Sequence, residues 1–530
     1  MKNLYHQIYH FNLKSQLLKQ IKQADKPFWS AFFSVFIVLN LIFLYHGAHF
    51  LFGDHDWFYA QKGIALNSSL FEGHFSQFIL TSLLTGGEIL PIINNAFGFL
   101  GFSLGIALLA HYWQVPHTRT NYIVFSLFTA ITPYILSSLY SAFLVIPVLS
   151  WNAFIIAGLL ISARESIFSW RKTISSVFLL TISLGGYPPV INLIAISLCV
   201  RLLIEIAERK TSLPQLWQTY RWSIINIILS FIAYKLCLIY LSSHHLINYN
   251  LQIIPFAEWP QKAISILPNI FRQFTITFPF IGEENRVLNL AIILLGTISL
   301  YQHTLTPKRF IAAIFLIILL FYSELLISFL SPAKSEADFS PHIAFWGYIY
   351  IIAAFLRFAL ISKQQILKNF TFIVALISII TSSHHLFEAE KVWKLGFDAE
   401  MKLYQRVAKR FQNQPNFTLN RRYIIIQGGT FPFREHFYHD NYRHPSEDLL
   451  AISYVPGMAS GVMWNYYGIT DYAHTTPYAY FLNPDPLLQQ AIHNITAWPK
   501  ANSIQVGPSW ILLPLTTDGI TELQRHYKTQ

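Results

Sequence analysis

Long apolar runs separated by short polar segments dominate the first 385 residues of the chain. Residues 31–45, 288–301 and 310–322 contain no charged side chain. A helix needs about 20 mostly apolar residues to cross the ~30 Å hydrocarbon core of a bilayer, and several runs reach that length with their uncharged flanks. The pattern therefore predicts an α-helical polytopic membrane protein.

We predict eleven transmembrane helices from these runs. Proline interrupts the third to the sixth, and it is tolerated in a span where neighbouring helices satisfy the freed carbonyl groups. The predicted spans are residues 29–48, 91–112, 121–138, 142–162, 173–187, 189–207, 222–242, 287–305, 310–331, 343–362 and 368–385.

The basic residues predict the orientation of these spans. With a cytoplasmic N-terminal tail, residues 1–28, eighteen Lys and Arg lie on the inner side before residue 386 and five on the outer side. This bias follows the positive-inside rule. It places everything after the eleventh span on the outer face of the membrane.

Three regions then lie outside the membrane domain, which covers residues 29–385. Two are the loops 49–90 and 243–286, and the third is the segment 386–530, which is rich in Tyr, His, Asn and Pro. Apolar residues at helical spacing predict a helix over 388–412, and short apolar runs ended by Gly or Pro predict strands in 421–429 and 503–515. We expect a small C-terminal α/β domain.

Composition narrows the class of protein. Of the 530 residues, 53% are hydrophobic and only 12% are charged, against roughly 25% charged in soluble proteins. This excludes a disordered chain and an ordinary soluble enzyme. The net charge of +11 reflects orientation in the membrane, so we expect membrane lipid and no nucleic acid as a partner. The two cysteines, Cys199 and Cys237, lie in apolar spans, which excludes a disulfide framework.

The stretch GDHDWFYAQKG (53–63) follows the first span directly. Asp54 or Asp56 can act as a general base on a hydroxyl at the membrane surface. The two diverge by about 200° on a helix, so one is expected to be catalytic and the other to orient or bind. Trp57 suits the interface or a sugar ring. The alternative is a polar helix end beside an aromatic belt.

The same loop continues with His74 and Glu88, in GHFSQ (73–77) and GGEILP (86–91). Polar groups of this density are unusual in a simple connection between spans. Residues 76–84 are apolar enough to form a short interfacial helix. An amphipathic surface helix with incidental polar residues explains them equally well.

Two charges, Lys235 and Glu324, lie well inside predicted spans and at a similar depth. Buried membrane charges are costly and point to function. The two can pair with each other, or Lys235 can receive a lipid phosphate. The stretch SLGGYPPVIN (183–192), with Tyr187, predicts a tight outer turn between two short spans.

The sequence contains no nucleotide-binding or serine-hydrolase motif. His436, His439, Asp440 and His444 have a spacing that permits metal binding, but a solvated loop explains this group better. No cofactor is predicted, and a divalent cation has no clear motif.

Together these features resemble the GT-C superfamily of membrane glycosyltransferases, and more narrowly the bacterial O-antigen glucosyltransferase family. The resemblance rests on GDHDW after the first span, GHFSQ, PYILSSLYSAF (133–143) and SLGGYPPV (183–190), within residues 28–385. Where the family pattern has Arg in the second motif, this chain has His74.

The resemblance implies transfer of a sugar, classically glucose, from a polyprenyl-phosphate donor to a glycan acceptor such as lipopolysaccharide O-antigen. It also implies a location in the cytoplasmic (inner) membrane of a bacterium, with the C-terminal domain in the periplasm. Asp54 or Asp56 would be the base, and Lys235 or His74 would stabilise the departing phosphate. Glu88, Glu324, Tyr187 and Trp57 complete the expected substrate-binding set.

Two other functions remain open at this point. A transporter or lipid-linked sugar flippase also uses broken helices and intramembrane charges, although it often shows internal repeats, which this sequence lacks. A non-catalytic partner in surface-glycan synthesis is the third possibility.

Overall fold

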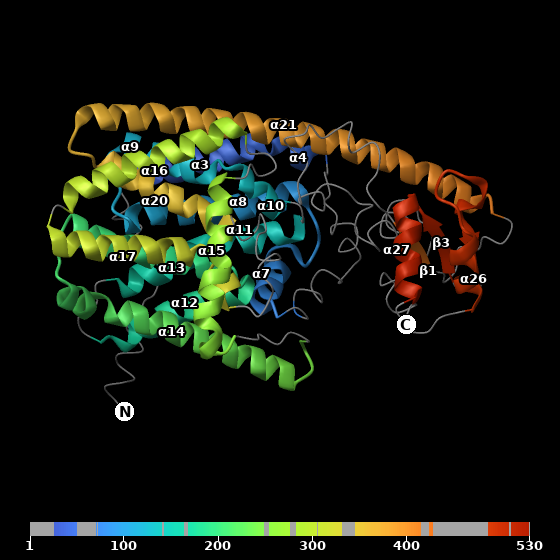
Figure 1. Ribbon diagram of the computed structural model, residues 1–530, viewed down its shortest axis with the longest axis horizontal. Helices are drawn as coiled ribbons and strands as arrows, with labels where there is room; N and C mark the ends of the chain where they lie inside the picture. Colours follow the sequence, from blue (N-terminus) through green and yellow to red (C-terminus); the bar gives the residue numbers. More distant parts are fainter. Residues whose placement is uncertain are drawn as a thin grey trace.

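The computed structural model of the protein describes residues 26–49, 70, 73–139, 142–163, 168–247, 254–275, 282–304, 306–330, 345–414, 423–427, 486–507 and 510–528. These residues are mostly helical. They form a bundle of helices and, at one end, a small unit with three strands (Figure 1).

Each predicted span falls on helical structure. Two of them, 91–112 and 142–162, have the bounds of α8 (Pro91–Tyr112) and α11 (Ala142–Ser162). The others contain α3 (Lys26–Ile42) with α4 (Leu44–Ala48), α9 (Arg119–Ala130) with η1 (Pro133–Ile135) and α10 (Leu136–Leu139), α12 (Trp170–Gly186), α13 (Val190–Ala207), α14 (Leu213–Ser243), α16 (Glu283–His303), α17 (Pro307–Ser323) with α18 (Leu326–Leu330), α20 (Tyr348–Leu360) and the first part of α21 (Gln365–Gln412).

Four helices of the described part are long and apolar enough to cross a membrane: α8, α13, α14 and the Gln365–Leu395 part of α21. Shorter apolar helices include α3, α20 and α7 (Phe75–Thr85), the last of which confirms the short helix predicted over 76–84. The fold therefore contains several helices suited to a membrane, while the number of eleven spans stays a prediction.

Three predicted spans are broken rather than continuous. The first is divided into α3 and α4 at Phe43. The third stops at Ala130 and resumes as η1 at Pro133, whose ring cannot donate the hydrogen bond that a continuing helix needs. The ninth stops at Ser323 and resumes at Leu326, which leaves Glu324 in the break. The predicted turn between α12 and α13 is confirmed, because α12 ends at Gly186 and α13 begins at Val190.

Glycine allows α8 and α11 to pack closely at the centre of the bundle. A Cβ atom on Gly101 would lie 2.6 Å from Ser150, and one on Gly105 would lie 2.6 Å from the backbone nitrogen of Ala153. Small residues at such crossings let helix backbones approach in apolar surroundings. The contact forms the inner layer of the bundle, with α3 and α9 packed on α8.

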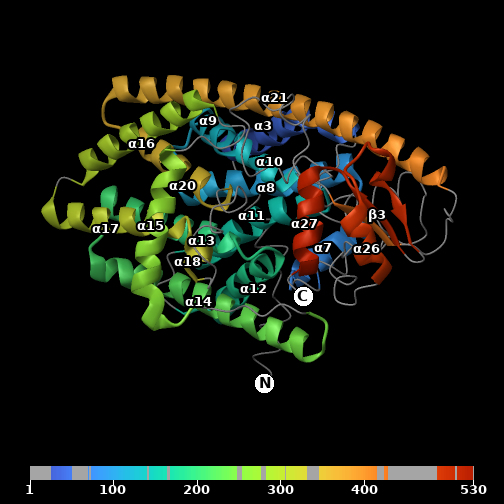
Figure 2. The ribbon, with the colours of Figure 1, turned by 45° about the vertical axis from the view of Figure 1, so that its right-hand side comes forward.

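The helix α21 connects the bundle to the C-terminal unit. It runs without a break through the predicted domain boundary at residue 386, and its 48 residues span about 72 Å at 1.5 Å per residue. Figures 1 and 2 show it extending from the bundle to the strands. Near its far end, the Arg410 guanidinium donates to the carbonyl oxygens of Pro499, Lys500 and Ala501 at 2.8–3.2 Å.

The C-terminal unit has a three-stranded sheet of order β1-β3-β2. β1 (Tyr423–Gln427) lies parallel to β3 (Trp510–Pro514), and β2 (Gln505–Val506) is antiparallel to β3. The strand predicted over 503–515 is therefore two strands, because the chain turns at Gly507, whose N–H donates to the Trp510 carbonyl. The helices α26 (Pro486–Asn494) and α27 (Thr517–Lys528) complete the unit.

Candidate functional site

The predicted site residues divide into two groups. Asp54, Asp56 and Trp57 lie outside the described residues, as does the group His436 to His444. His74, Glu88, Tyr187, Lys235 and Glu324 are described.

The structure brings two sequence motifs together, GHFSQ and SLGGYPPV. The rings of His74 and Tyr187 lie 6.1 Å apart, although the residues are far apart in sequence. The neighbouring Phe75 packs against Gly185, where an added Cβ atom would lie 2.2 Å from the Phe75 ring. Trp151 of α11 packs against Gly186 in the same way, with an added Cβ atom only 1.9 Å away. The two glycines thus allow α7 and α11 to reach the end of α12, and this contact positions Tyr187.

His74 begins this arrangement as the residue directly before α7. Removal from water lowers the pKa of His74 to about 4, because burial disfavours the charged form. At neutral pH the ring is therefore an uncharged imidazole. Such a ring can donate or accept a hydrogen bond, which favours that role for His74 over the role of a fixed cation beside a phosphate.

Tyr187 also connects His74 to a buried carboxylate. The Tyr187 and Trp346 rings lie 6.5 Å apart. The next residue, Gly347, is so close to Glu324 that an added Cβ atom would lie 2.7 Å from the Glu324 Cγ atom. His74, Tyr187, Trp346 and Glu324 thus form a continuous series of neighbours, which we call the Tyr187 cluster.

Glu324 owes its position to a break in the helix. Asn192 of α13 donates from Nδ2 to the Glu324 backbone carbonyl at 2.7 Å, and its Oδ1 accepts from the Ile327 N–H at 2.9 Å. One side chain thus satisfies the backbone on both sides of the break between α17 and α18, as a break at membrane depth requires.

The carboxyl group of Glu324 itself is fully buried. Neither of its oxygens has a hydrogen-bonding partner among the described residues. Tyr134 and Tyr348 are its electrostatic neighbours. A buried carboxyl group without a partner is costly, so Glu324 is a functional candidate rather than a stabilising residue.

Two roles were open for Lys235, a pair with Glu324 or a lipid phosphate, and the structure does not form the pair. Lys235 lies on α14, which packs on α12 and α11, and it makes no hydrogen bond to either Glu324 oxygen. The similar depth predicted for the two residues says nothing about which face of the bundle each one occupies, and that is why the inference fails. Glu88 is exposed in the turn between α7 and α8.

Sequence reasoning missed a buried group at the end of the first predicted span. His46 of α4 is fully buried, its ring 4.7 Å from that of Trp393 on α21. The side-chain Nδ2 of Asn95 lies 3.2 Å from His46 Nδ1, and the buried Glu390 side chain of α21 lies beside the His46 backbone. The predicted acidic motif begins at Gly53, seven residues after His46 in the sequence, so these contacts fix the chain shortly before it.

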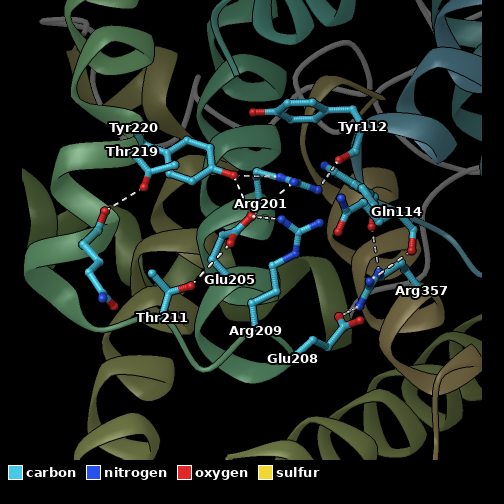
Figure 3. A network of polar contacts seen from close by, with 12 residues as sticks. Tyr112, Gln114, Arg201, Glu205, Glu208, Arg209, Thr211, Thr219, Tyr220 and Arg357 are labelled. Atoms are coloured by element: carbon cyan, nitrogen blue, oxygen red, sulfur yellow. Dashed lines mark hydrogen bonds and ion pairs between the residues drawn. The ribbon is translucent and has the colours of Figure 1, made fainter. Parts of the chain in front are cut away.

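Glu324 lies near the start of α20, and a second polar region lies at the C-terminal end of the same helix (Figure 3). Arg201 donates from Nε to the Tyr220 hydroxyl at 2.9 Å, from Nη1 to the Tyr112 carbonyl at 2.9 Å and from Nη2 to Glu205 at 3.2 Å. The Tyr220 hydroxyl in turn donates to Glu205 at 2.8 Å. Arg209 approaches the same carboxylate at 3.4 Å.

Arg357 extends this network to the end of α8. Its Nε donates to the Trp113 carbonyl at 2.8 Å and its Nη2 to the Gln114 carbonyl at 3.0 Å. Its Nη1 pairs with Glu208. Cations near a helix C-terminus satisfy its free carbonyls and interact favourably with its dipole. The Arg201–Arg357 network therefore holds the helices together.

In the sequence, Arg201, Arg209 and Arg357 count only as inner-side charges that orient the spans. Nothing in that interpretation predicts that they bind other helices. Arg201, Glu205 and Arg209 follow one another at four-residue intervals at the end of α13, and this spacing was the available signal for part of the network. The contacts of Arg357 with α8 have no such signal, because these residues are more than 240 positions apart.

Comparison with protein-family models, with curated proteins and with solved structures found no match. The resemblance to membrane glycosyltransferases therefore rests on the sequence motifs alone.

Proposed function

We propose that the protein is a membrane glycosyltransferase that moves a sugar, glucose in the first instance, from a polyprenyl-phosphate donor to a surface glycan. The observation that carries the proposal is the contact between GHFSQ and SLGGYPPV at His74 and Tyr187, with Glu324 buried behind Trp346. These are motifs on which the family resemblance rests, and they meet although they are far apart in sequence.

The reaction needs a base, an acceptor hydroxyl and a leaving phosphate. The acceptor oxygen attacks the anomeric carbon while the bond from that carbon to the phosphate oxygen breaks. Asp54 or Asp56 takes the hydroxyl proton, and polyprenyl phosphate leaves with the electron pair. A single displacement inverts the anomeric centre.

The described residues supply binding groups for this reaction. Aromatic rings such as Tyr187 and Trp346 offer apolar faces for a sugar. Glu324 can accept hydrogen bonds from sugar hydroxyls, and neutral His74 can donate to a phosphate or hydroxyl oxygen. No metal ion is needed in this scheme.

A lipid-linked sugar flippase is the second candidate. The broken α17–α18 segment with a buried carboxylate favours it, since transporters place such residues at discontinuous helices. The two functions differ in their sensitive residues, because a flippase should tolerate changes at Asp54 and Asp56 better than a change at Glu324.

The decisive experiment measures transfer of labelled glucose from a polyprenyl-phosphate donor to candidate glycans by purified protein in detergent. We expect transfer by the wild type, its loss in either Asp54→Asn or Asp56→Asn, and its retention in the control Glu258→Gln, at an exposed residue of η2 (Phe256–Glu258). Donor movement between liposome leaflets without transfer, unchanged in both Asp variants, would establish the flippase instead.

A further inference from the structure

A groove with a volume of about 880 Å³ lies between α3 and α9, away from the Tyr187 cluster. Its lining is mostly apolar, with Trp29 and Ile37 from α3 and Ile123 from α9. Lys26 and Arg119 are its two cationic lining residues. Neither of them pairs with an acidic residue of the described part of the chain.

The two cations lie at the same end of the groove. Lys26 is the first residue of α3 and Arg119 the first of α9. An added Cβ atom on Gly47 of α4 would meet Ile92 in the first turn of α8, so α3 and α4 run antiparallel to α8. α9 follows the end of α8 after six residues and therefore runs parallel to α3. Figure 1 shows α3 and α9 running in the same direction, toward α4 and α10.

The groove has the depth of one bilayer leaflet. From Lys26 to Val38 the α3 side extends about 18 Å at 1.5 Å per residue, and half of the ~30 Å hydrocarbon core is about 15 Å. The outer face of α3 is apolar over the same distance, with Phe33 and Ile37 both about half exposed, at 53% and 52%. Such a surface faces lipid rather than water.

We propose that this groove binds an anionic phospholipid, with the phosphate between Lys26 and Arg119 and an acyl chain along the apolar wall. Charge complementarity selects the occupant, because two cations beside an apolar channel match a phosphate attached to a hydrocarbon chain. Trp29 lies one turn beyond Lys26, where an amphipathic ring suits the headgroup level. The orientation predicted from the basic residues places this end in the inner leaflet.

Each cation near an anionic membrane surface contributes about fivefold in affinity, so the pair should favour an anionic over a zwitterionic lipid by roughly 30-fold. The test uses the purified full-length protein with phosphatidylglycerol and phosphatidylcholine of identical acyl chains, and measures bound lipid by native mass spectrometry. Lys26→Gln with Arg119→Gln should abolish the preference. Lys308→Gln with Arg309→Gln, which removes two basic residues from the start of α17 outside the groove, should leave it unchanged.

A second pair of variants keeps the test valid if the double Gln variant folds poorly. Lys26→Arg with Arg119→Lys preserves both charges and should retain the preference, whereas Ser34→Phe, which fills the groove wall, should reduce binding of both lipids. Equal retention of phosphatidylglycerol by the Gln variant and its control would overturn the proposal. Displacement of the lipid by inorganic phosphate alone, or a dimer that Ser34→Phe disrupts, would also overturn it.

Discussion

The two ends of α20 border buried ionisable side chains that differ in their hydrogen bonding. In its last turn, Arg357 donates from all three guanidinium nitrogens to Glu208 and to the carbonyls that end α8. Beside its first turn, Glu324 is equally buried, yet neither carboxyl oxygen has a partner among the described residues. One end of α20 therefore borders a polar group whose hydrogen bonds are complete within the fold. The other end borders a group that, within the described part of the chain, is free to bind a ligand.

This difference indicates which buried polar group stabilises the fold and which one serves function. A buried ion whose hydrogen bonds are complete holds helices in place, and removal of one partner leaves the other uncompensated. A buried carboxyl group without partners contributes no such contact, so its removal should spare the fold. Changes at the fully hydrogen-bonded Arg357 should therefore affect stability, and changes at Glu324 should affect activity.

Replacing Arg357 by Met should destabilise the protein by about 3–5 kcal/mol, because Glu208 and the last carbonyls of α8 lose their donor. Thermal unfolding of the purified protein in detergent measures the effect. Arg209→Met is the matched control: Arg209 is 33% exposed, and its loss should cost less than about 1 kcal/mol. Equal effects of the two changes would show that burial of the network does not set its contribution.

Replacing Glu324 by Gln should lower activity and leave stability intact, in contrast to Arg357→Met. We expect an unchanged or higher melting temperature, since Gln has nearly the shape of Glu and leaves no ionisable group to bury. Sugar transfer should fall by about 10- to 100-fold, as expected when a hydrogen bond from a charged group, about 1.5–3 kcal/mol, is lost. A lower melting temperature with intact transfer would make Glu324 a structural residue and remove it from the site.

Replacing Gly186 by Ala should disturb the Tyr187 cluster through packing alone. The added methyl group overlaps the Trp151 ring, and overpacking of this kind costs about 1–3 kcal/mol. Transfer activity should fall with stability, because Tyr187 is the next residue. Gly158→Ala is the control, since its added Cβ atom would lie 3.1 Å from the flexible Leu180 side chain. Similar losses in both variants would argue against a special role for the Gly186 contact.

The smallest effect is expected at Glu284, at the start of α16. The backbone N–H of Glu284 and the nearby His385 Nε2, 2.7 Å away, lower the pKa of this carboxyl group. A lowered pKa stabilises the fold above the ordinary carboxyl value of 4.5 and loses that contribution as the pH falls below it. Because Glu284 is half exposed, Glu284→Gln should cost less than about 1 kcal/mol at pH 7.

Melting curves of the wild type and Glu284→Gln between pH 3 and pH 7 provide the measurement. The gap between them should close on acidification. A gap that widens toward low pH would mean that the carboxylate is not stabilised in the folded protein.

The chain alone determined the helical elements to a large extent. Uninterrupted apolar runs predicted α8 and α11 with the bounds that the structure has, and the apolar segments near 423 and 510 predicted strands. These predictions depend on local composition and on the positions of Gly and Pro, which act within a few residues. The motifs around His74 and Tyr187 were likewise visible as unusual polar and glycine-rich segments.

The tertiary structure decided which of these residues meet. Lys235 and Glu324 seemed matched by depth, but α14 packs on α12 and α11, whereas the α17–α18 break is held by Asn192 of α13. His74 and Tyr187 come into contact because Gly185 and Gly186 allow two other helices to approach α12. The partners of Arg357 lie between 149 and 244 residues away. Helix packing angles and close backbone approach set these contacts, and no local pattern in the chain encodes them.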